Sequence, residues 1–271
     1  KRLVEDYFNA QVNSPVFAIL ILDFVGDALQ LADTVQSLSR YNFIYPHIKI
    51  FIFSESIVEL VGYQDGLVFV QVDFVGYVTA LNSVVDQGGF DWLMLVRAGE
   101  EFTKYGLMMA AQEIINISDC RALFGDEYLR LADGTLAGSF RPSFNFDLLL
   151  SFPAAMTHHW LFRRDIFLSA GGFNSSYKDA LEFDLLLRLI EQGGLSGFGH
   201  VDEPLVITEA PQLVDNFCEK EAILRHLQVR GYQAEILAHL PGRYRIAYNH
   251  NAQPLISIIV PTKDQLAMLQ R

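Results

Sequence analysis

Glu182, Asp184 and Arg188 are the residues whose types and spacing most clearly suggest chemistry. They lie in residues 181–191, a run that is otherwise apolar almost all round and therefore predicts a buried helix. Asp184 and Arg188 stand four apart with the acid first, which favours an ion pair on one helical face. Glu182 has an apolar residue at i+4 and no such partner. A carboxylate near the start of a buried helix, just after a glycine-containing loop, is suited to act as a general base at the floor of a cleft.

A second interpretation of Glu182 is structural. Asp179-Ala-Leu-Glu182 resembles a capping box, in which Asp179 is the N-cap and Glu182 reaches back to the backbone N–H of the cap. Local pattern alone supports the cap and the base about equally.

The stretch that begins at Gly171-Gly172-Phe173 resembles the acceptor-side motif of inverting family 2 glycosyltransferases, which have the GT-A fold. In that family the motif usually reads Glu/Gln-Asp-Tyr/Trp-Asp-Leu, followed by Leu-Arg, and its first Asp is the catalytic base. The resemblance places Glu182 on the base, Asp184 on the second acid and Arg188 on the Arg. Leu181 stands where Glu or Gln is usual, and Glu replaces Asp at the base.

Apolar runs alternate with helical patterns along the first hundred residues. Val16–Leu22, Ile48–Phe53, Leu67–Val72 and Phe90–Val96 read as strands of a parallel sheet. Their spacing predicts an α/β fold with a βαβ series and a mostly parallel central sheet, in which ligands bind at the carboxyl ends of the strands. The resemblance makes this fold GT-A-like: a Rossmann-type nucleotide-binding half followed by an acceptor-binding half.

The end of the fourth predicted strand departs from the family. Relatives carry an Asp-x-Asp signature there, which binds the divalent metal of the nucleotide diphosphate, whereas this chain reads Arg97-Ala98-Gly99-Glu100. Relatives also often place a His ligand where this chain has Ile207. Mg²⁺ and Mn²⁺ prefer hard oxygen ligands, and Arg97 offers none. Three alternatives therefore stay open. Glu100 is a weak metal ligand, or Arg97 neutralises the diphosphate without a metal, or Arg97 and Glu100 form an ordinary solvated turn.

Other polar residues follow the predicted strands. Asp23, Ser54 and Glu55 stand where the family contacts the base or ribose of the donor, and they are equally consistent with ordinary loop residues. Asp126 and Glu127 belong to a block, residues 123–151, that resembles the subset of the family that makes bacterial surface polysaccharides, often rhamnosyltransferases or O-antigen enzymes. Both acids are expected to face the donor sugar, or else to be solvated.

His158, His159 and Trp160 lie on a stretch expected to be extended. Neighbouring side chains on a strand point to opposite faces, so the two histidines do not form a chelate. His159 and Trp160 are expected to line the acceptor site, with core packing as the alternative for Trp160.

Composition narrows the class of partner. A net charge of −12 argues against nucleic acid, and Val16–Leu22, the longest apolar run, is too short to be a transmembrane segment. Cys120 and Cys218 have no zinc spacing and suggest a reducing compartment. We expect a cytoplasmic protein, either free or peripheral to the inner membrane.

The sequence predicts three segments. Residues 1–248 form a GT-A-like domain, residues 249–254 a linker by composition, and residues 255–271 the start of a second glycosyltransferase domain, because Leu255–Asp264 resembles the opening strand of such a domain. A last strand of the same domain is the alternative.

The resemblance implies inverting transfer of a sugar from a nucleotide-sugar to a hydroxyl of a glycan, a lipid-linked or a protein acceptor. Glu182 would be the base, and Asp184 and Arg188 would support the helix or contact the acceptor. Mg²⁺ or Mn²⁺ either assists or is replaced by Arg97. The competing hypothesis is a non-catalytic domain that binds acceptor or scaffolds a neighbouring transferase domain.

Overall fold

A mixed β-sheet organises the chain. The computed structural model describes residues 14–41, 44–57, 66–249 and 255–259, and within them the sheet has the strand order β3-β2-β1-β4-β8-β6-β9-β5, with β7 paired to β6. Strands β3, β2, β1 and β4 are parallel neighbours, and β8 pairs antiparallel with both β4 and β6. The predicted α/β class with a largely parallel sheet is confirmed. The strands are β1 (Phe17–Asp23), β2 (Ile48–Ser54), β3 (Leu67–Gln71), β4 (Trp92–Arg97), β5 (Glu101–Phe102), β6 (Ala122–Arg130), β7 (Leu136–Ser139), β8 (Leu161–Arg163) and β9 (Phe198–Glu209).

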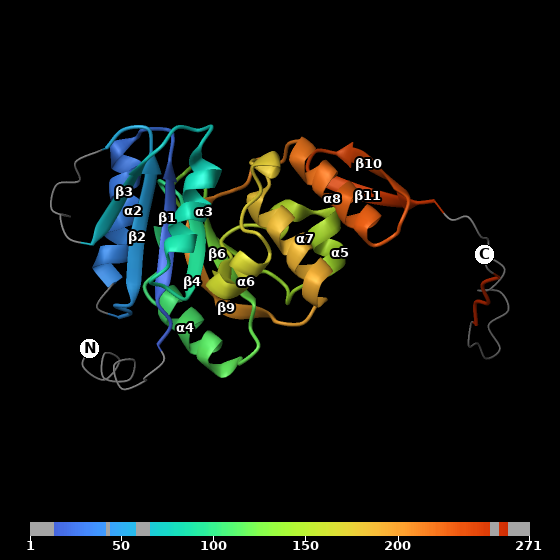
Figure 1. The fold of residues 1–271 in the computed structure, drawn as a ribbon, viewed down its shortest axis with the longest axis horizontal. Helices are drawn as coiled ribbons and strands as arrows, with labels where there is room; N and C mark the ends of the chain where they lie inside the picture. Colours follow the sequence, from blue (N-terminus) through green and yellow to red (C-terminus); the bar gives the residue numbers. More distant parts are fainter. Residues whose placement is uncertain (1–13, 42–43, 58–65, 250–254, 260–271) are drawn as a thin grey trace.

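Helices cover the sheet and extend the molecule beyond it. Figure 1 shows the strands β1 to β3 at one end, and α5, α7, α8 and the hairpin β10–β11 at the other. The helices are α2 (Ala28–Tyr41), α3 (Tyr77–Gln87), α4 (Gly106–Asn116), α5 (Phe146–Ser151), α6 (Arg164–Ser169), α7 (Leu181–Gly193) and α8 (Phe217–Val229), with the hairpin strands β10 (Ala234–Leu240) and β11 (Arg243–Tyr248).

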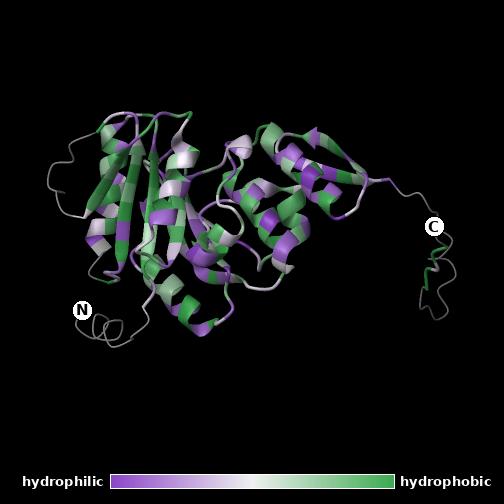
Figure 2. Ribbon diagram, viewed as in Figure 1, coloured by the Kyte–Doolittle hydropathy of each residue, from purple (hydrophilic) through white to green (hydrophobic). Residues whose placement is uncertain are grey.

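Strand β1 is buried on both faces, as its unbroken apolar sequence predicts. Ala18 and Leu20 belong to one core cluster, and Phe17, Ile19 and Ile21 to the other. Successive side chains of a strand point to opposite faces, so one strand anchors both layers. Figure 2 shows the same pattern as hydrophobic colour along the inner strands and mixed colour on the helices.

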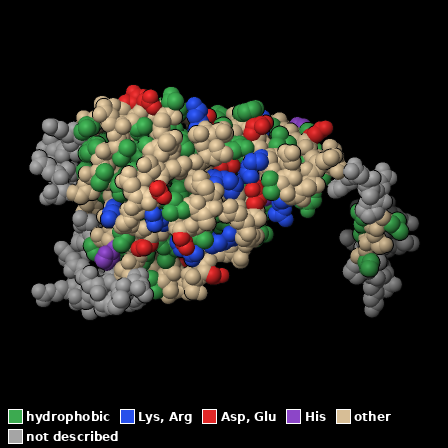
Figure 3. All heavy atoms as spheres, viewed as in Figure 1, with side chains coloured by type: hydrophobic (Ala, Val, Ile, Leu, Met, Phe, Trp, Pro, Cys, Tyr) green, Lys and Arg blue, Asp and Glu red, His purple; other side chains and the backbone are tan. Residues whose placement is uncertain are grey.

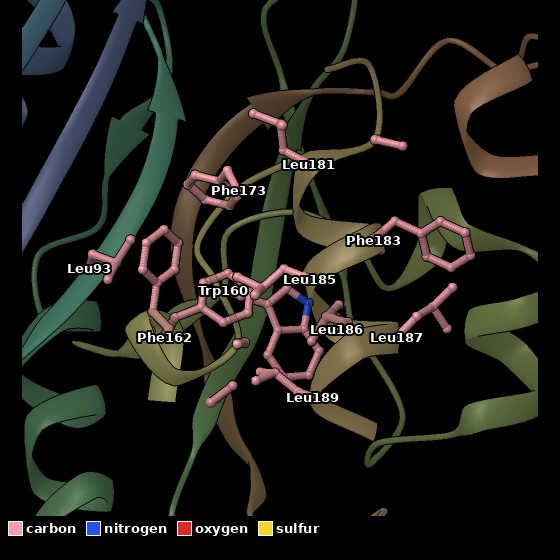
Figure 4. Close-up of a cluster of buried hydrophobic side chains, with 14 of the residues drawn as sticks. Leu93, Trp160, Phe162, Phe173, Leu181, Phe183, Leu185, Leu186, Leu187 and Leu189 are labelled. Carbon is pink, nitrogen blue, oxygen red and sulfur yellow. The ribbon is translucent and has the colours of Figure 1, made fainter. Parts of the chain in front are cut away.

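Helix α7 is buried against the segment before β8. Its positions from Leu181 to Ile190 are buried except Arg188. Figure 4 shows Leu185 and Leu189 beside the ring of Trp160, while Phe183 points to the opposite side. Trp160 is fully buried, and its indole N–H donates to the Met156 carbonyl oxygen at 2.5 Å. Tight packing on both sides of α7 holds its first turn, and therefore Glu182, in a defined place.

The structure describes only a short part of the predicted second domain. Most of the predicted linker and residues 260–271 lie outside the described residues. Residues 255–259 form neither helix nor strand, and Leu255 is 96% exposed. Among the described residues, no helix combines the length and apolar character needed to cross a bilayer.

Two adjacent glycines at the start of the loop before α7 have left-handed backbone conformations. Gly171 has φ 85° and Gly172 has φ 72°. A Cβ on Gly171 would meet nothing within 4 Å, whereas one on Gly172 would lie 2.6 Å from Asn82 Oδ1. That amide side chain accepts from the Phe173 N–H at 2.9 Å and donates to the Phe173 carbonyl oxygen at 2.8 Å. The loop is therefore clamped to α3.

This difference predicts unequal effects of two alanine substitutions. Gly171→Ala should cost about 1–2 kcal/mol of unfolding free energy, the penalty for a left-handed non-glycine residue. Gly172→Ala should cost about 1–2 kcal/mol more, because its Cβ displaces Asn82 from two partly buried hydrogen bonds. Urea denaturation measures both. Equal losses in the two variants would contradict the clamp.

Candidate active site

A cleft opens where the carboxyl ends of β1 and β4 meet the start of α7. An inner cavity of about 80 Å³ is lined by Leu22, Tyr77, Leu95, Arg97, Thr157, His158, Lys178, Asp179, Ala180, Leu181, Glu182, Phe183 and Glu219. An outer cavity of about 200 Å³ shares Arg97, His158, Asp179 and Glu219 with it and continues to residues 211–214, Asn216 and Gly242. The shared walls make the two cavities one cleft, at the sheet edge where α/β folds bind ligands.

Glu182 forms part of the wall of the inner cavity. Its side chain accepts from the Trp160 backbone N–H at 3.1 Å through Oε1, and Oε2 accepts no hydrogen bond from the residues that the structure describes. Burial raises the pKa of Glu182 to about 7, although the charges of His159 and Arg97 and the Trp160 N–H oppose the shift. A carboxylate with a free oxygen and a pKa near neutrality has the properties of a general base.

The capping-box interpretation of Glu182 is wrong. Helix α7 has Ala180 as its N-cap, without a side-chain cap. The Glu182 carboxylate turns instead toward Trp160, 22 residues earlier in the chain.

Arg97 lies on both cavities. It is exposed, and its guanidinium makes no ion pair within the part of the chain that the structure describes. The Glu100 N–H donates to the Arg97 carbonyl oxygen at 3.1 Å, so the expected turn is present. A fixed, unpaired cation therefore faces the same cleft as Glu182.

Glu100 and Glu127 hold His159 between them. His159 Nε2 lies 3.0 Å from Glu100 Oε2, and Nδ1 lies 2.5 Å from Glu127 Oε1. Burial alone would lower the pKa of His159, but the two carboxylates raise it to about 10, so the ring is an imidazolium. Burial likewise acts against ionisation of Glu100, yet His159 and the Arg97 N–H lower its pKa to about 2.

The acids predicted to face the donor sugar are also paired internally. Arg141 donates to Glu127 through its guanidinium and to Asp126 Oδ1 through its backbone N–H at 2.8 Å. His200 Nε2 lies 3.2 Å from the same Asp126 oxygen. Asp126 and Glu127 are buried and line neither cavity of the cleft.

The residues at the expected metal position do not fit a divalent cation. Arg97 is a cation, and Glu100 is already engaged by His159, by the Arg97 N–H at 2.7 Å and by the Thr208 hydroxyl at 3.1 Å. Ile207 supplies no ligand atom. Among the described residues no cluster of three or more His, Cys, Asp or Glu side chains has the geometry to hold a metal.

The structure places the two histidines differently from the sequence prediction. Residues 157–159 form bends before β8, not an extended strand, and His159 has φ 58°. His158 is the one that lines the cleft, and burial, followed by the charges of His159 and Arg97, lowers its pKa to about 4. His159 and Trp160 are interior and do not reach the cleft.

The predicted ion pair on α7 is confirmed. Arg188 Nε donates to Asp184 Oδ2 at 2.9 Å, and Nη2 donates to the Gly172 carbonyl oxygen at 2.6 Å. Arg225 of α8 approaches Asp184 Oδ1 at 3.3 Å. These charges join α7 to α8 and to the glycine loop, outside the cleft.

Asp23, Ser54 and Glu55, the other residues predicted to contact the donor, lie at or just after the carboxyl ends of β1 and β2. Asp23 is the register partner of Ser54 at the carboxyl ends of β1 and β2. Both are buried, and Asp23 Oδ2 has no hydrogen-bond partner among the described residues. Burial raises the pKa of Asp23. Glu55 is exposed, and none of the three lines the cleft.

Sequence reasoning missed several residues of the cleft. Lys178 and Asp179 lie in the loop before α7, and Asn216 and Glu219 in the first turn of α8. Asn216 is the α8 N-cap, and its side chain accepts from the Cys218 and Glu219 N–H groups. An Asn two to three residues before an acid signals a helix start, but nothing local shows that this start faces a cleft.

Charge on the viewed surface is dispersed. Figure 3 shows Lys and Arg side chains interspersed with Asp and Glu on that face. This face therefore has no basic patch that would bind a polyanion such as nucleic acid, in keeping with the net charge of −12.

Comparisons with known proteins show what this chain resembles. No family model matches the chain. O-antigen biosynthesis protein RfbC of Myxococcus xanthus is 28% identical over 191 residues, covering 66% of this chain and 15% of that protein. The uncharacterized protein y4gI of Sinorhizobium fredii is 25% identical over 204 residues, covering 70% and 22%. The chain thus matches only a small part of each longer relative.

Solved structures show the same architecture. S. aureus TarS (residues 1–349) superposes with a TM-score of 0.60 at 12% identity, covering 79% of this chain and 65% of that one. TarS in complex with UDP-GlcNAc gives a TM-score of 0.61 at 12% identity, covering 79% and 66%. The chain has a GT-A-like glycosyltransferase fold and is a distant homologue of an O-antigen biosynthesis protein.

The buried His159 imidazolium should be essential for stability. His159→Asn keeps a side chain that tolerates left-handed backbone but leaves the buried Glu100 without its paired cation and Glu127 with Arg141 alone, at a cost of about 3 kcal/mol. Because the pKa of His159 is raised from 6.5 to about 10, this loss should be full below pH 6.5 and shrink as pH rises toward 10. Chemical denaturation at pH 6 and pH 10 measures it. His158→Asn is the matched control, and a similar loss in it would contradict a specific role for His159.

The ionised side chain of Glu182 should lower the free energy of unfolding at neutral pH and above. Its raised pKa means that the folded state retains a proton that the unfolded chain releases between pH 4.5 and 7, so stability falls as pH rises through this range. Glu182→Gln should therefore stabilise the protein by on the order of 2 kcal/mol at pH 8 and have little effect at pH 4.5. Thermal unfolding at both pH values tests this, with exposed Glu221→Gln as the control. A pH-independent difference would show that Glu182 titrates normally.

Proposed function

We propose that this chain is an inverting glycosyltransferase domain that transfers a sugar from a nucleotide-sugar to a hydroxyl of a glycan, lipid-linked or protein acceptor in surface-polysaccharide or glycoprotein assembly. The observation that carries the proposal is the position of Glu182: a buried carboxylate with pKa about 7 on the wall of a cleft at the carboxyl ends of β1 and β4. The GT-A-like fold and the distant likeness to an O-antigen biosynthesis protein support it.

In the proposed reaction Glu182 removes the proton of the acceptor hydroxyl. The acceptor oxygen attacks the anomeric carbon of the donor, and the bond from that carbon to the diphosphate oxygen breaks on the opposite face, so that the nucleotide diphosphate leaves with the electron pair. Oε1 is held by the Trp160 N–H, which leaves Oε2 to take the proton. A positioned base of this kind contributes roughly 10²–10⁴ in rate.

Arg97 is the proposed partner of the leaving diphosphate. Its guanidinium faces the cleft without an ion-pair partner in the described chain. A guanidinium binds phosphate oxygens through paired N–H donors and stabilises the charge that develops as the bond breaks. This assignment requires no Mg²⁺ or Mn²⁺.

A second function has its own supporting observation. Glu100, the acid nearest the family's metal position, is tied to His159 and Thr208 and is not available to a ligand. A domain that has lost donor binding but retains the cleft would bind acceptor or scaffold a neighbouring transferase domain of the same chain. Exposed apolar side chains at Leu255, Ile256, Ile258 and Ile259 fit a segment that such a neighbour covers.

The two functions differ in nucleotide binding. Calorimetric titration with UDP, dTDP, GDP and their sugars, with Mn²⁺ and with EDTA, should show binding that survives EDTA and falls at least tenfold in Arg97→Ala, because a charge-assisted phosphate contact is lost. Turnover with the sugar nucleotide that binds should fall 10²–10⁴-fold in Glu182→Gln, and wild-type turnover should rise with pH through about 7.

Arg164→Ala serves as the control for charge. Its guanidinium donates to the carbonyl oxygens of Val85 and Asp86, and it lines neither cavity. Loss of binding in EDTA would favour a metal-dependent site. Absence of nucleotide binding at millimolar concentration would reject transfer by this domain and favour the acceptor-binding role.

A further inference from the structure

A separate cavity of about 260 Å³ lies at the C-terminal end of α8, and it is larger than either cavity of the cleft. Its apolar walls come from Phe146 and Leu150 of α5, Leu227 of α8, and Tyr232 and Tyr248 at the open end of the hairpin β10–β11, elements that Figure 1 shows together. It shares no lining residue with the cleft. Because ligand pockets have volumes of roughly 300–1,000 Å³, this cavity suits one ring rather than a long chain.

Two tyrosines form an aromatic corner at this cavity. Tyr232 is 50% exposed and Tyr248 is 42% exposed. Their ring centroids lie 5.5 Å apart, and the ring planes meet at 74°. A flat ligand can stack on only one of two such planes, whereas a chair-shaped pyranose ring has C–H bonds that point in several directions and can contact both rings. The corner therefore suits a saccharide ring.

His226, in the wall of the same cavity, has one ring nitrogen without a partner. The side chain is 1% exposed, and Nδ1 lies 2.8 Å from Glu191 Oε1, a carboxylate that Arg225 also holds at 2.8 Å. Burial lowers the pKa of His226, so the ring is neutral, Nδ1 donates to the carboxylate, and Nε2 is an acceptor. Nε2 has no hydrogen-bond partner among the described residues. Buried polar atoms are rarely left unpaired, so this nitrogen points to a donor on a bound molecule.

Arg230 is the cation of this cavity. It is the exposed C-cap residue of α8, and it makes no ion pair within the described ranges. The described residues that line the cavity include no carboxylate. The guanidinium N–H groups are therefore available to donate to a ligand oxygen.

We infer that this cavity is a second saccharide-binding site, which holds one pyranose ring of a glycan. The C–H surface of the ring contacts Tyr232 and Tyr248, and one hydroxyl donates to His226 Nε2. Arg230 donates to a further oxygen of the sugar. An alkyl chain would leave both polar groups unpaired, and a flat nucleobase would lie against one tyrosine only. The site does not depend on the proposed transfer reaction, because an active transferase and a scaffold that binds glycan can both use it.

Direct binding tests the inference in the absence of nucleotide. Protein-observed NMR titrations would use N-acetylglucosamine, methyl α-mannopyranoside, methyl β-galactopyranoside and glucuronic acid as saccharide probes, with uracil as the flat ring and hexanol as the alkyl chain. At least one saccharide should shift the resonances of Tyr232 and Tyr248, and uracil and hexanol should bind there about tenfold more weakly. The ¹⁵N resonance of His226 Nε2 should move on saccharide binding, because it reports a hydrogen bond to that nitrogen.

Matched variants separate recognition from folding. Tyr232→Ala should weaken saccharide binding about five- to tenfold, because one aromatic contact is lost. Tyr105 is also 50% exposed but does not line the cavity, so Tyr105→Ala should bind as the wild type does. Tyr248→Ala tests the other side of the corner, and His226→Phe keeps an aromatic ring but removes the acceptor, so both should weaken binding. Circular dichroism and thermal unfolding confirm that each variant is folded.

Three results would overturn the inference: no saccharide binding at high millimolar concentration, uracil or hexanol binding at the corner as tightly as the best saccharide, or equal binding by Tyr232→Ala and Tyr105→Ala. Failure of the transferase proposal has a different signature, because nucleotide binding and turnover would be absent while saccharide binding still depends on Tyr232.

Discussion

The buried contact of one imidazolium with two carboxylates is the interaction on which the centre of this molecule depends. Glu100 follows β4, Glu127 lies in β6, and His159 precedes β8, so the three residues join the parallel part of the sheet to its mixed part. Either carboxylate alone at this depth would carry a large desolvation cost. With His159 charged, the turn at Arg97 and the segment before β8 are held in one arrangement.

The same contact determines the environment of Glu182. His159 has left-handed backbone, and the next residue, Trp160, directs its N–H to Glu182 Oε1. The imidazolium charge also limits how far burial raises the pKa of Glu182. A value near 7 is the compromise between an apolar helix, which favours the protonated acid, and a nearby cation, which favours the carboxylate. The environment of the proposed base therefore depends on His159 and Trp160, which do not line the cleft.

The sequence was a good guide wherever structure follows from a repeated local pattern. Strands β1 and β2 lie where the apolar runs predict them, because an unbroken run of apolar residues encodes a buried strand in adjacent positions. The Asp184–Arg188 pair was predictable from helical spacing for the same reason. The roles of His158 and His159 were not, since a single left-handed residue exchanges which side chain faces the cleft. Glu182 likewise meets Trp160 rather than its own helix end, and Glu219 meets Tyr244, through contacts that span 22 and 25 residues.

Arg97 and Glu100 differ from the metal motif of the family resemblance in different ways: one is an exposed cation and the other a buried, paired acid. If only the metal ligands had been lost, Glu100 would be a buried carboxylate without a partner, which is strongly unfavourable. Instead both its oxygens are bonded, and within the described chain neither Glu100 nor Glu127 has an unsatisfied buried oxygen. Arg97, which stands where the family resemblance expects a metal ligand, makes no ion pair within the described chain and lines the cleft. Pairing of the buried acids is required for stability in an active and in an inactive domain alike, so Glu100 and Glu127 do not separate the two functions. In the proposed reaction the guanidinium of Arg97 supplies the charge that a metal would otherwise supply to the diphosphate. Phosphate binding at Arg97 is therefore the feature that separates an active transferase from a scaffold.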